Sequence, residues 1–491
     1  MASRQPNILL FFTDQQRFDT IAALGNDIIR TPSMDRLANE GVAFTRCFTP
    51  SPVCVAARCA LMTGLPPHVT GCTHNNPMPT DQPSVVERLH DAGYQTHGVG
   101  KMHFSPDLKR LWGYDTRDIS EEIASDVSDY MRHLHAAGYE HVIDPAGIRS
   151  EYYYIPQPSQ FPAHLHETHW VADRSIEFLA RRDRGRPFFM MTSFIKPHPP
   201  FENPTPWNRL YRCADMPDPH RPDGYEALLT YHNHRQNRYK YRGSGYDREL
   251  VRTMRAAYYA CISFIDYNVG RVLDALGAEI DNTLIVFTAD HGELLGDYGS
   301  FGKRSMLDVA CRVPMLVRQP GVFEGGGRCE APVSLLDLWP TFLSAAGQRE
   351  VRRHADGAAL QSVLAEPDAR QVTFSQYDSG GTGLYMAATR THKYYHSAAD
   401  QRQWLFDLVA DPRETRDVSR DAAQAGALRA MRGHLFERFA RDGYRQPLND
   451  DATDWAVHET KHVPTDPDEG LLFQDPAVLK DQLAALGPYG R

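Results

Sequence analysis

The sequence predicts an α/β fold in which helices sandwich a large, mainly parallel sheet, followed by a smaller C-terminal α+β domain. Through about residue 365, short continuous apolar runs alternate with amphipathic segments, which is typical of buried parallel strands connected by helices. After Val372 the pattern changes to short strand-like runs separated by turn residues, which favours a separate unit. A chain of 491 residues also exceeds the usual size of a single hydrophobic core, so we expect two domains.

The first predicted strand is Asn7 to Phe12, a continuous apolar run that ends at Thr13-Asp14. A short helix is predicted from Ser33 to Gly41, because a capping residue, apolar residues at helical spacing and a final glycine follow in order. Ser84 to Gly93 repeats this pattern and leads into a predicted strand from Thr96 to Val99.

Two more apolar runs, Phe188 to Ile195 and Thr283 to Thr288, complete the set of predicted buried strands. Open α/β sheets bind ligands at the carboxyl ends of their strands. We therefore expect the polar residues that follow the four strands to gather in one site. These residues are Asp14 with Gln15, Lys101 with His103, Lys196 with His198, and Asp290 with His291.

The C-terminal part of the chain is predicted to contain four short strands and a helix from Ser419 to Arg441. From about Gln446 the sequence is rich in Asp and Pro and has no clear periodicity. We expect this tail to pack on a neighbouring subunit of a homo-oligomer. The predicted strands are 372–374, 384–388, 393–396 and 404–408, and the predicted domains are 1–365 (catalytic α/β), 366–445 (smaller α+β) and 446–491 (tail).

Composition excludes several classes of function. A net charge of −9 does not suit a protein that binds nucleic acid through phosphate contacts. No apolar stretch approaches the roughly 18 residues of a membrane span. Because Met1 to Pro6 leads directly into the first strand without a signal-peptide pattern, we expect a cytoplasmic protein. The eight cysteines form no CxxC pair, so a thiolate zinc site is not expected.

Cys54, in Cys54-Val55-Ala56-Ala57-Arg58, would by itself be interpreted as a buried thiol. However, the whole segment 31–64 resembles the N-terminal signature of sulfatases, in which Cys-x-Pro/Ala-x-Arg is the signal for oxidation of the cysteine to formylglycine. Many members have proline at the position of Ala56, and alanine is an accepted variant. The resemblance implies that Cys54 becomes the catalytic nucleophile, with the help of a formylglycine-generating maturation enzyme.

A second segment, 92–103, resembles the second sulfatase signature, which ends in Gly-Lys-x-His, here Gly100 to His103. The resemblance covers most of the chain except the tail and the loops 104–180 and 202–250, and it implies an alkaline phosphatase-like fold. Its further matches are 193–198, 288–293, 302–303, 404–408 and 411–414.

The residues Asp14, Gln15, Asp290 and His291 offer mostly oxygen ligands, which suit a hard divalent cation such as calcium or magnesium. The resemblance implies that oxidised residue 54 is the fifth ligand. It also shows that Gln15 stands where many sulfatases have aspartate, and His291 where asparagine is frequent. One carboxylate fewer and one imidazole more leave manganese open.

The resemblance further implies a mechanism in which hydrated formylglycine attacks the sulfur of a small sulfate ester and expels the alcohol. The sulfated hemiacetal then releases sulfate and returns to the aldehyde. The implied roles are sulfate binding and charge stabilisation for Lys101 and Lys303, proton removal from the second hydroxyl for His103, proton donation to the departing oxygen for His198, and orientation of residue 54 for Arg58.

Two other functions remain open at this point. A phosphonate monoester or phosphodiester hydrolase would share the oxidised cysteine and the Asp14-Gln15 pair, but Lys101 and His103 match the sulfatase pattern, so we favour sulfate monoesters with promiscuity. A binding-only relative that never forms the aldehyde would lack some catalytic residues, yet every expected position is filled.

The sequence does not identify the alcohol, which could be an aryl, alkyl, choline or sugar alcohol. Tyr152 to Tyr154 and Arg235 to Arg242 offer aromatic and cationic side chains that could line its pocket, although a solvated loop explains them equally well. Lys196 is a further candidate contact.

Overall fold

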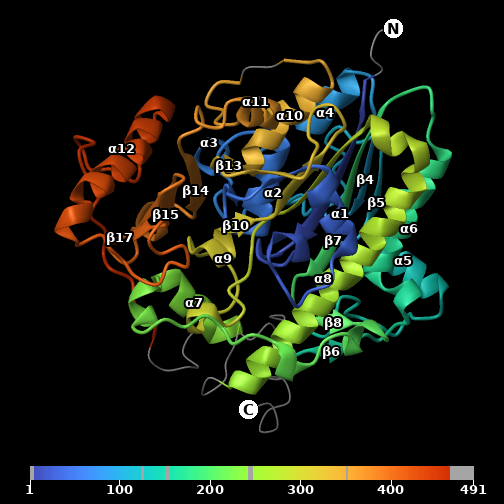
Figure 1. Cartoon of the computed structure of the whole chain (residues 1–491), viewed down its shortest axis with the longest axis horizontal. Coiled ribbons are helices and arrows are strands. Elements are labelled where there is room, and N and C mark those ends of the chain that lie inside the picture. Colours follow the sequence, from blue (N-terminus) through green and yellow to red (C-terminus); the bar gives the residue numbers. More distant parts are fainter. Residues whose placement is uncertain (1–4, 123–126, 150–153, 241–246, 350–351, 465–491) are drawn as a thin grey trace, which may run out of the picture.

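An eight-stranded sheet in the order β12-β2-β11-β9-β1-β7-β4-β5 forms the centre of the molecule (Figure 1). The computed structural model describes residues 5–122, 127–149, 154–240, 247–349 and 352–464. Five neighbouring strands, from β9 to β5, are parallel, and β11 runs antiparallel to β9. The strands are β1 (Asn7–Asp14), β2 (Val42–Phe44), β4 (Gln95–Gly100), β5 (Thr116–Ile119), β7 (Phe188–Pro197), β9 (Thr283–Ala289), β11 (Met315–Arg318) and β12 (Gly327–Cys329).

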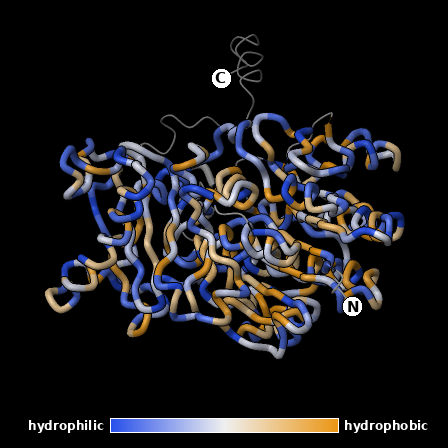
Figure 2. The backbone as a smooth tube through the Cα atoms, turned by 90° about the horizontal axis from the view of Figure 1, so that it is seen from above, coloured by the Kyte–Doolittle hydropathy of each residue, from blue (hydrophilic) through white to orange (hydrophobic). Residues whose placement is uncertain are grey.

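Helices cover both faces of the sheet, and strand β1 shows why its sequence is continuously apolar. Ile8, Leu10 and Phe12 pack into one hydrophobic cluster with α2, α4 and α10, whereas Leu9 and Phe11 pack into another with α1, α6 and α8. In Figure 2 hydrophobic runs lie toward the middle of the fold and hydrophilic segments form much of its outline. The helices are α1 (Pro32–Glu40), α2 (Cys54–Thr63), α4 (Val85–Asp91), α6 (Glu167–Arg181), α8 (Arg248–Leu276) and α10 (Leu338–Ala345). The predicted α/β sandwich is confirmed.

The smaller C-terminal unit is a four-stranded antiparallel sheet with α12 packed against it (Figure 1). Helix α12 begins at Ala425, several residues after the predicted start at Ser419. The preceding segment is held to the sheet, because the backbone N–H of Val418 donates to the carbonyl of Leu405 at 2.8 Å. The elements are β14 (Thr373–Tyr377), β15 (Leu384–Ala388), β16 (His392–Ser397), β17 (Arg402–Asp407) and α12 (Ala425–Asp442).

Strand β14 joins this sheet to the segments on either side of α2. The backbone N–H of Gln376 donates to the carbonyl of Pro50 at 2.9 Å, and that of Asp378 donates to the carbonyl of Thr73 at 2.8 Å. Backbone pairing therefore links the C-terminal sheet to the segment that carries Cys54.

Part of the predicted tail packs on the chain's own C-terminal sheet. The Trp455 ring stacks on His396 with a centroid separation of 4.1 Å, and its Nε1 donates to the Tyr394 hydroxyl at 2.9 Å. Residues 465–491 lie outside the described residues, so packing of the tail on a neighbouring subunit stays a prediction. Among the helices described, none is long and apolar enough to cross a membrane.

Candidate active site

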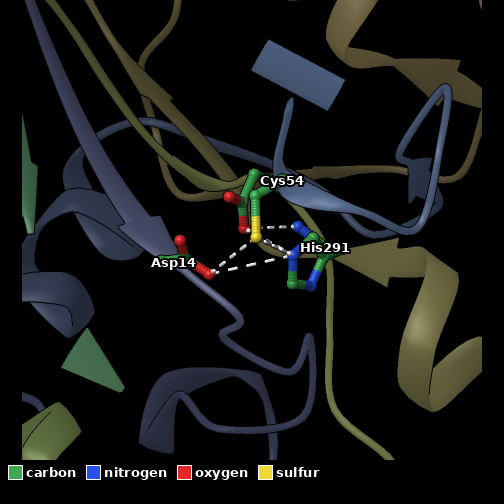
Figure 3. Close-up of side chains that lie close together, drawn as sticks. Asp14, Cys54 and His291 are labelled. Carbon is green, nitrogen blue, oxygen red and sulfur yellow. Dashed lines mark hydrogen bonds and ion pairs between the residues drawn. The ribbon is translucent and has the colours of Figure 1, made fainter. Parts of the chain in front are cut away.

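Four predicted site residues converge at the carboxyl ends of β1 and β9. Asp14 ends β1, Asp290 and His291 follow β9, and Cys54 is the first residue of α2. One ligand atom from each of the four lies within 4.8 Å of the others, and all four side chains are buried. The sulfur of Cys54 lies 3.2 Å from His291 Nε2 and 3.6 Å from Asp14 Oδ1 (Figure 3).

Helix α2 positions two of the predicted catalytic residues. Cys54 stands at its N-terminus, where the unpaired backbone N–H groups give a positive potential. Arg58 is four residues later, so it lies on the same face of the helix. Its Nε is 3.0 Å from Asp290 Oδ2, and its Nη1 donates to Ser193 Oγ at 3.1 Å. The guanidinium therefore connects α2 to β7 and to the end of β9.

Two buried lysines add positive charge around this cluster. Lys303 Nζ lies 2.7 Å from the Cys54 sulfur and 3.1 Å from His291 Nε2. Lys101 Nζ contacts Asp14 and lies 2.7 Å from Glu122 Oε2. Both ammonium groups are almost completely buried, so their charges act through a low dielectric and are weakly screened.

These charges decide the protonation of the cluster. Burial alone raises the pKa of Asp14, but Lys101, His198 and Lys303 outweigh it and hold that pKa well below its usual value. Burial and the charge of Asp14 raise the pKa of the Cys54 thiol, yet Lys303 and Lys101 bring it well below its ordinary value. The two lysines therefore stabilise negative charge on residue 54 and on Asp14.

The donor atoms of the cluster fit a divalent cation. Asp14 and Asp290 supply carboxylates and His291 an imidazole. The side-chain oxygen of Gln15 is buried and has no hydrogen-bond partner among the described residues, whereas its Nε2 donates to Glu293. A buried acceptor without a donor is costly, and a bound cation would satisfy it. Oxygen donors with one imidazole suit calcium, magnesium or manganese.

The two predicted catalytic histidines differ in their burial and in their hydrogen-bond partners. His198 is buried, with Nδ1 2.7 Å from the carbonyl oxygen of Pro199 and Nε2 3.1 Å from Glu122 Oε1. His103 is partly buried and has a φ of 54°; its backbone N–H donates to Glu121 Oε1 at 3.0 Å. Its Nδ1 has no hydrogen-bond partner within the described part of the chain.

Sequence reasoning missed three polar residues that hold the site together. Ser193 binds Arg58, Glu293 binds Gln15, and Glu122 contacts Lys101, His198 and the guanidinium of Arg149. Ser193 and Glu293 lie within the matched motifs, so their positions could have been noted. Glu122 follows the polar edge strand β5, whose sequence contains no apolar run that would predict a strand.

The polar groups of Lys196 and Tyr154 form hydrogen bonds within the protein. Lys196 Nζ donates to the carbonyls of Ala146 and Pro200 at 2.8 and 2.6 Å, and so supports the loop that carries His198. Tyr154 is buried, and its hydroxyl donates to Glu293 at 2.9 Å. Arg235 is exposed on α7 (Tyr231–Lys240). Tyr152, Tyr153 and residues 241–242 lie outside the described residues.

Comparison with known families gives two matches. The family model described as Sulfatase matches residues 6–348, and the model described as N-sulphoglucosamine sulphohydrolase, C-terminal, matches residues 296–440. Together they span nearly all elements described above, including the four-stranded C-terminal sheet.

Individual relatives agree with these matches. The chain is 28% identical to an arylsulfatase of Clostridium perfringens, over 84% of this chain and 90% of that protein. It is 30% identical to the multifunctional alkaline phosphatase superfamily protein PehA of Trinickia caryophylli, over 86% of this chain and 93% of that protein. The crystal structure of the phosphonate monoester hydrolase of Agrobacterium radiobacter superposes with a TM-score of 0.76 at 26% identity, covering 92% of this chain and all of that chain.

Proposed function

Because this chain belongs to the sulfatase family of the alkaline phosphatase superfamily, it is a sulfuric ester hydrolase, and we propose that it cleaves small sulfate monoesters with a formylglycine made from Cys54. The observation that carries this proposal is the position of the two buried ammonium groups. Lys303 lies against residue 54, and Lys101 lies against Asp14. Two fixed cations beside a nucleophile suit an ester whose leaving and transferred groups are anionic.

We propose Asp14, Gln15, residue 54, Asp290 and His291 as ligands of one divalent metal ion, with calcium favoured and magnesium or manganese as alternatives. The ion would supply positive charge that lowers the pKa of an oxygen ligand and polarises it. Formylglycine would supply, in its hydrated form, a hydroxyl nucleophile. A separate maturation enzyme is needed to oxidise Cys54.

The remaining residues are assigned roles through their own contacts. Lys101 and Lys303 bind the oxygens of the sulfate group, and Arg58 holds residue 54 by bridging Asp290 and Ser193. His198 donates a proton to the departing alcohol oxygen, and His103 removes a proton from residue 54 in the second half of the reaction.

Hydrolysis of phosphonate monoesters is the second candidate function. The superposition with the Agrobacterium radiobacter enzyme favours it, and so does the pairing of Asp14 with Gln15. We place it as a side activity, because Lys101 and His103 match the sulfatase signature.

Two measurements test the proposal. Peptide mass spectrometry of protein from a host that matures sulfatases should show a loss of about 18 Da at Cys54, as expected for conversion of the thiol to the aldehyde. The same preparation should hydrolyse 4-nitrophenyl sulfate faster than 4-nitrophenyl phenylphosphonate, and Cys54→Ala should be inactive on both. An unmodified Cys54 in active protein contradicts the mechanism, and faster phosphonate cleavage contradicts the substrate class.

A further inference from the structure

Glu122 places a carboxylate among three cationic side chains at the edge of the candidate site. Its side chain is only 15% exposed. Oε2 accepts a hydrogen bond from Lys101 Nζ at 2.7 Å, whereas Oε1 contacts the Arg149 guanidinium and lies 3.1 Å from His198 Nε2. A negative charge beside a site for an anionic ester repels the substrate. The role of Glu122 must therefore lie in what it does to its neighbours.

The environment of His198 shows what that role is. Its Nδ1 faces the carbonyl oxygen of Pro199 at 2.7 Å, so this nitrogen carries a hydrogen that it donates to the carbonyl. Its Nε2 faces a carboxylate oxygen of Glu122. Acceptors at both nitrogens favour the doubly protonated imidazole, which is a cationic acid, over the neutral form. Nε2 then carries the proton that can be given away, and Glu122 orients it.

We propose that Glu122 is a positioning residue that keeps the Nε2 proton of His198 available to the departing alcohol oxygen. This inference rests on the proposed sulfatase function. As the bond between sulfur and the alcohol oxygen breaks, its electron pair stays on that oxygen. The N–H bond at Nε2 breaks and delivers the proton, so the imidazole becomes neutral and the alcohol leaves uncharged. Glu122 remains ionised throughout, beside Lys101 and Arg149.

The other charges that face His198 make such a carboxylate necessary. Burial, Lys303 and Lys101 together hold the pKa of His198 well below its ordinary value in the free site; Glu122 is the largest influence in the opposite direction, followed by Asp14. A bound sulfate ester brings a negative charge between the two ammonium groups and so offsets their effect on the imidazole. Glu122 and the substrate thus favour the acid form together.

The test compares esters whose alcohols differ in acidity. 4-Nitrophenolate leaves without a proton, whereas an alkyl alcohol or phenol of higher pKa needs one. In Glu122→Gln, which keeps the shape and removes the charge, kcat/KM for an alkyl sulfate should fall about 100-fold, and that for 4-nitrophenyl sulfate should fall less than about tenfold. The alkaline side of the pH profile for the alkyl ester should move to lower pH. His198→Ala should show the same selectivity, and the double variant should be no more selective than His198→Ala.

Glu121→Gln is the matched control on the same loop. The Glu121 carboxylate accepts the backbone N–H groups of Met102 and His103 at 3.2 and 3.0 Å and does not contact His198, so its loss should change both esters by the same factor. Glu122→Asp, which keeps the charge but withdraws it from Nε2, should show a smaller shift of the same kind and serves if Glu122→Gln does not fold. Equal losses on both esters in either Glu122 variant overturn the inference. A wild-type enzyme that cleaves no sulfate ester refutes the proposed function instead.

Discussion

Replacing Lys393 with methionine should weaken the attachment of the C-terminal sheet to the catalytic part of the chain. Lys393 lies on β16 and is completely buried. Its Nζ is 2.6 Å from Asp308 Oδ1, at the start of α9 (Asp308–Cys311), and it also pairs with Glu414. Methionine has a similar length without the charge, so the variant leaves two buried carboxylates around an apolar side chain.

The loss of unfolding free energy depends on how well the two carboxylates are compensated once Lys393 is gone. Removing one partner of a buried ion pair costs about 3–5 kcal/mol, because the other charge stays buried. Arg312 Nη1 still lies 3.1 Å from Asp308 Oδ2 and compensates that carboxylate in part. Glu414 retains no such partner among the contacts described, so most of the cost arises there.

The cost should depend on pH. Burial and the charge of Asp308 raise the pKa of Glu414 to about 7 even with Lys393 present, and loss of the lysine raises it further. A carboxyl group whose pKa is higher in the folded than in the unfolded chain lowers stability as pH rises from the unfolded value toward the folded one. The deficit of Lys393→Met should thus be small near pH 5 and should grow as the pH rises above about 7, where Glu414 ionises in the wild-type protein before it does so in the variant.

Urea unfolding followed by tryptophan fluorescence measures this deficit, because Trp404 is buried in the neighbouring strand β17. Lys461→Met is the control: its ion pair with Glu459 is 3.9 Å long and exposed, so its loss should cost less than about 1 kcal/mol. Two results would refute the reasoning. One is a loss of unfolding free energy in Lys393→Met below about 1 kcal/mol at pH 8, and the other is a loss at pH 5 as large as that at pH 8.

Three further outcomes are expected. Arg58→Lys should lower kcat/KM at least ~100-fold with little change in thermal midpoint, because a single ammonium cannot replace the guanidinium that bridges Asp290 and Ser193; retention of activity would contradict the positioning role. Removal of divalent ions with a chelator should lower the thermal midpoint of the matured enzyme and added calcium should restore it, whereas Asp290→Asn should not respond. Trp455→Ala should destabilise the C-terminal sheet by about 3 kcal/mol in urea unfolding, since a buried ring that stacks on His396 is lost; an unchanged midpoint would mean that this part of the tail adds no stability.

The elements that the sequence predicted best were those with one dominant signal. β1, β7 and β9 are continuously apolar because both their faces are covered. The α4 helix was predicted from the capping residue Ser84, and in the structure Ser84 forms a capping box with Glu87. β5 was missed because it is a polar strand at the edge of the sheet, so no apolar run marks it.

The candidate site likewise contains residues that a local sequence pattern indicates and residues that it does not. Residues at strand ends and in the two signatures could be proposed from the sequence, because their positions follow from the local pattern. Glu122 could not be proposed in this way, since its role depends on the fold, which brings Lys101, His198 and Arg149 together around its carboxylate. No spacing of residues in the sequence indicates that these side chains are neighbours.

The backbone hydrogen bonds that join β14 and Asp378 to Pro50 and Thr73 also bear on the order in which the chain is synthesised and folded. These partners bracket Cys54, but Gln376 and Asp378 are made more than 300 residues later. At the ~5–20 residues per second of translation, the nucleophile segment waits on the order of 15–60 s before its final partners exist. In the complete fold Cys54 is 1% exposed. The proposed oxidation of this thiol is therefore expected to take place while the chain is still being synthesised.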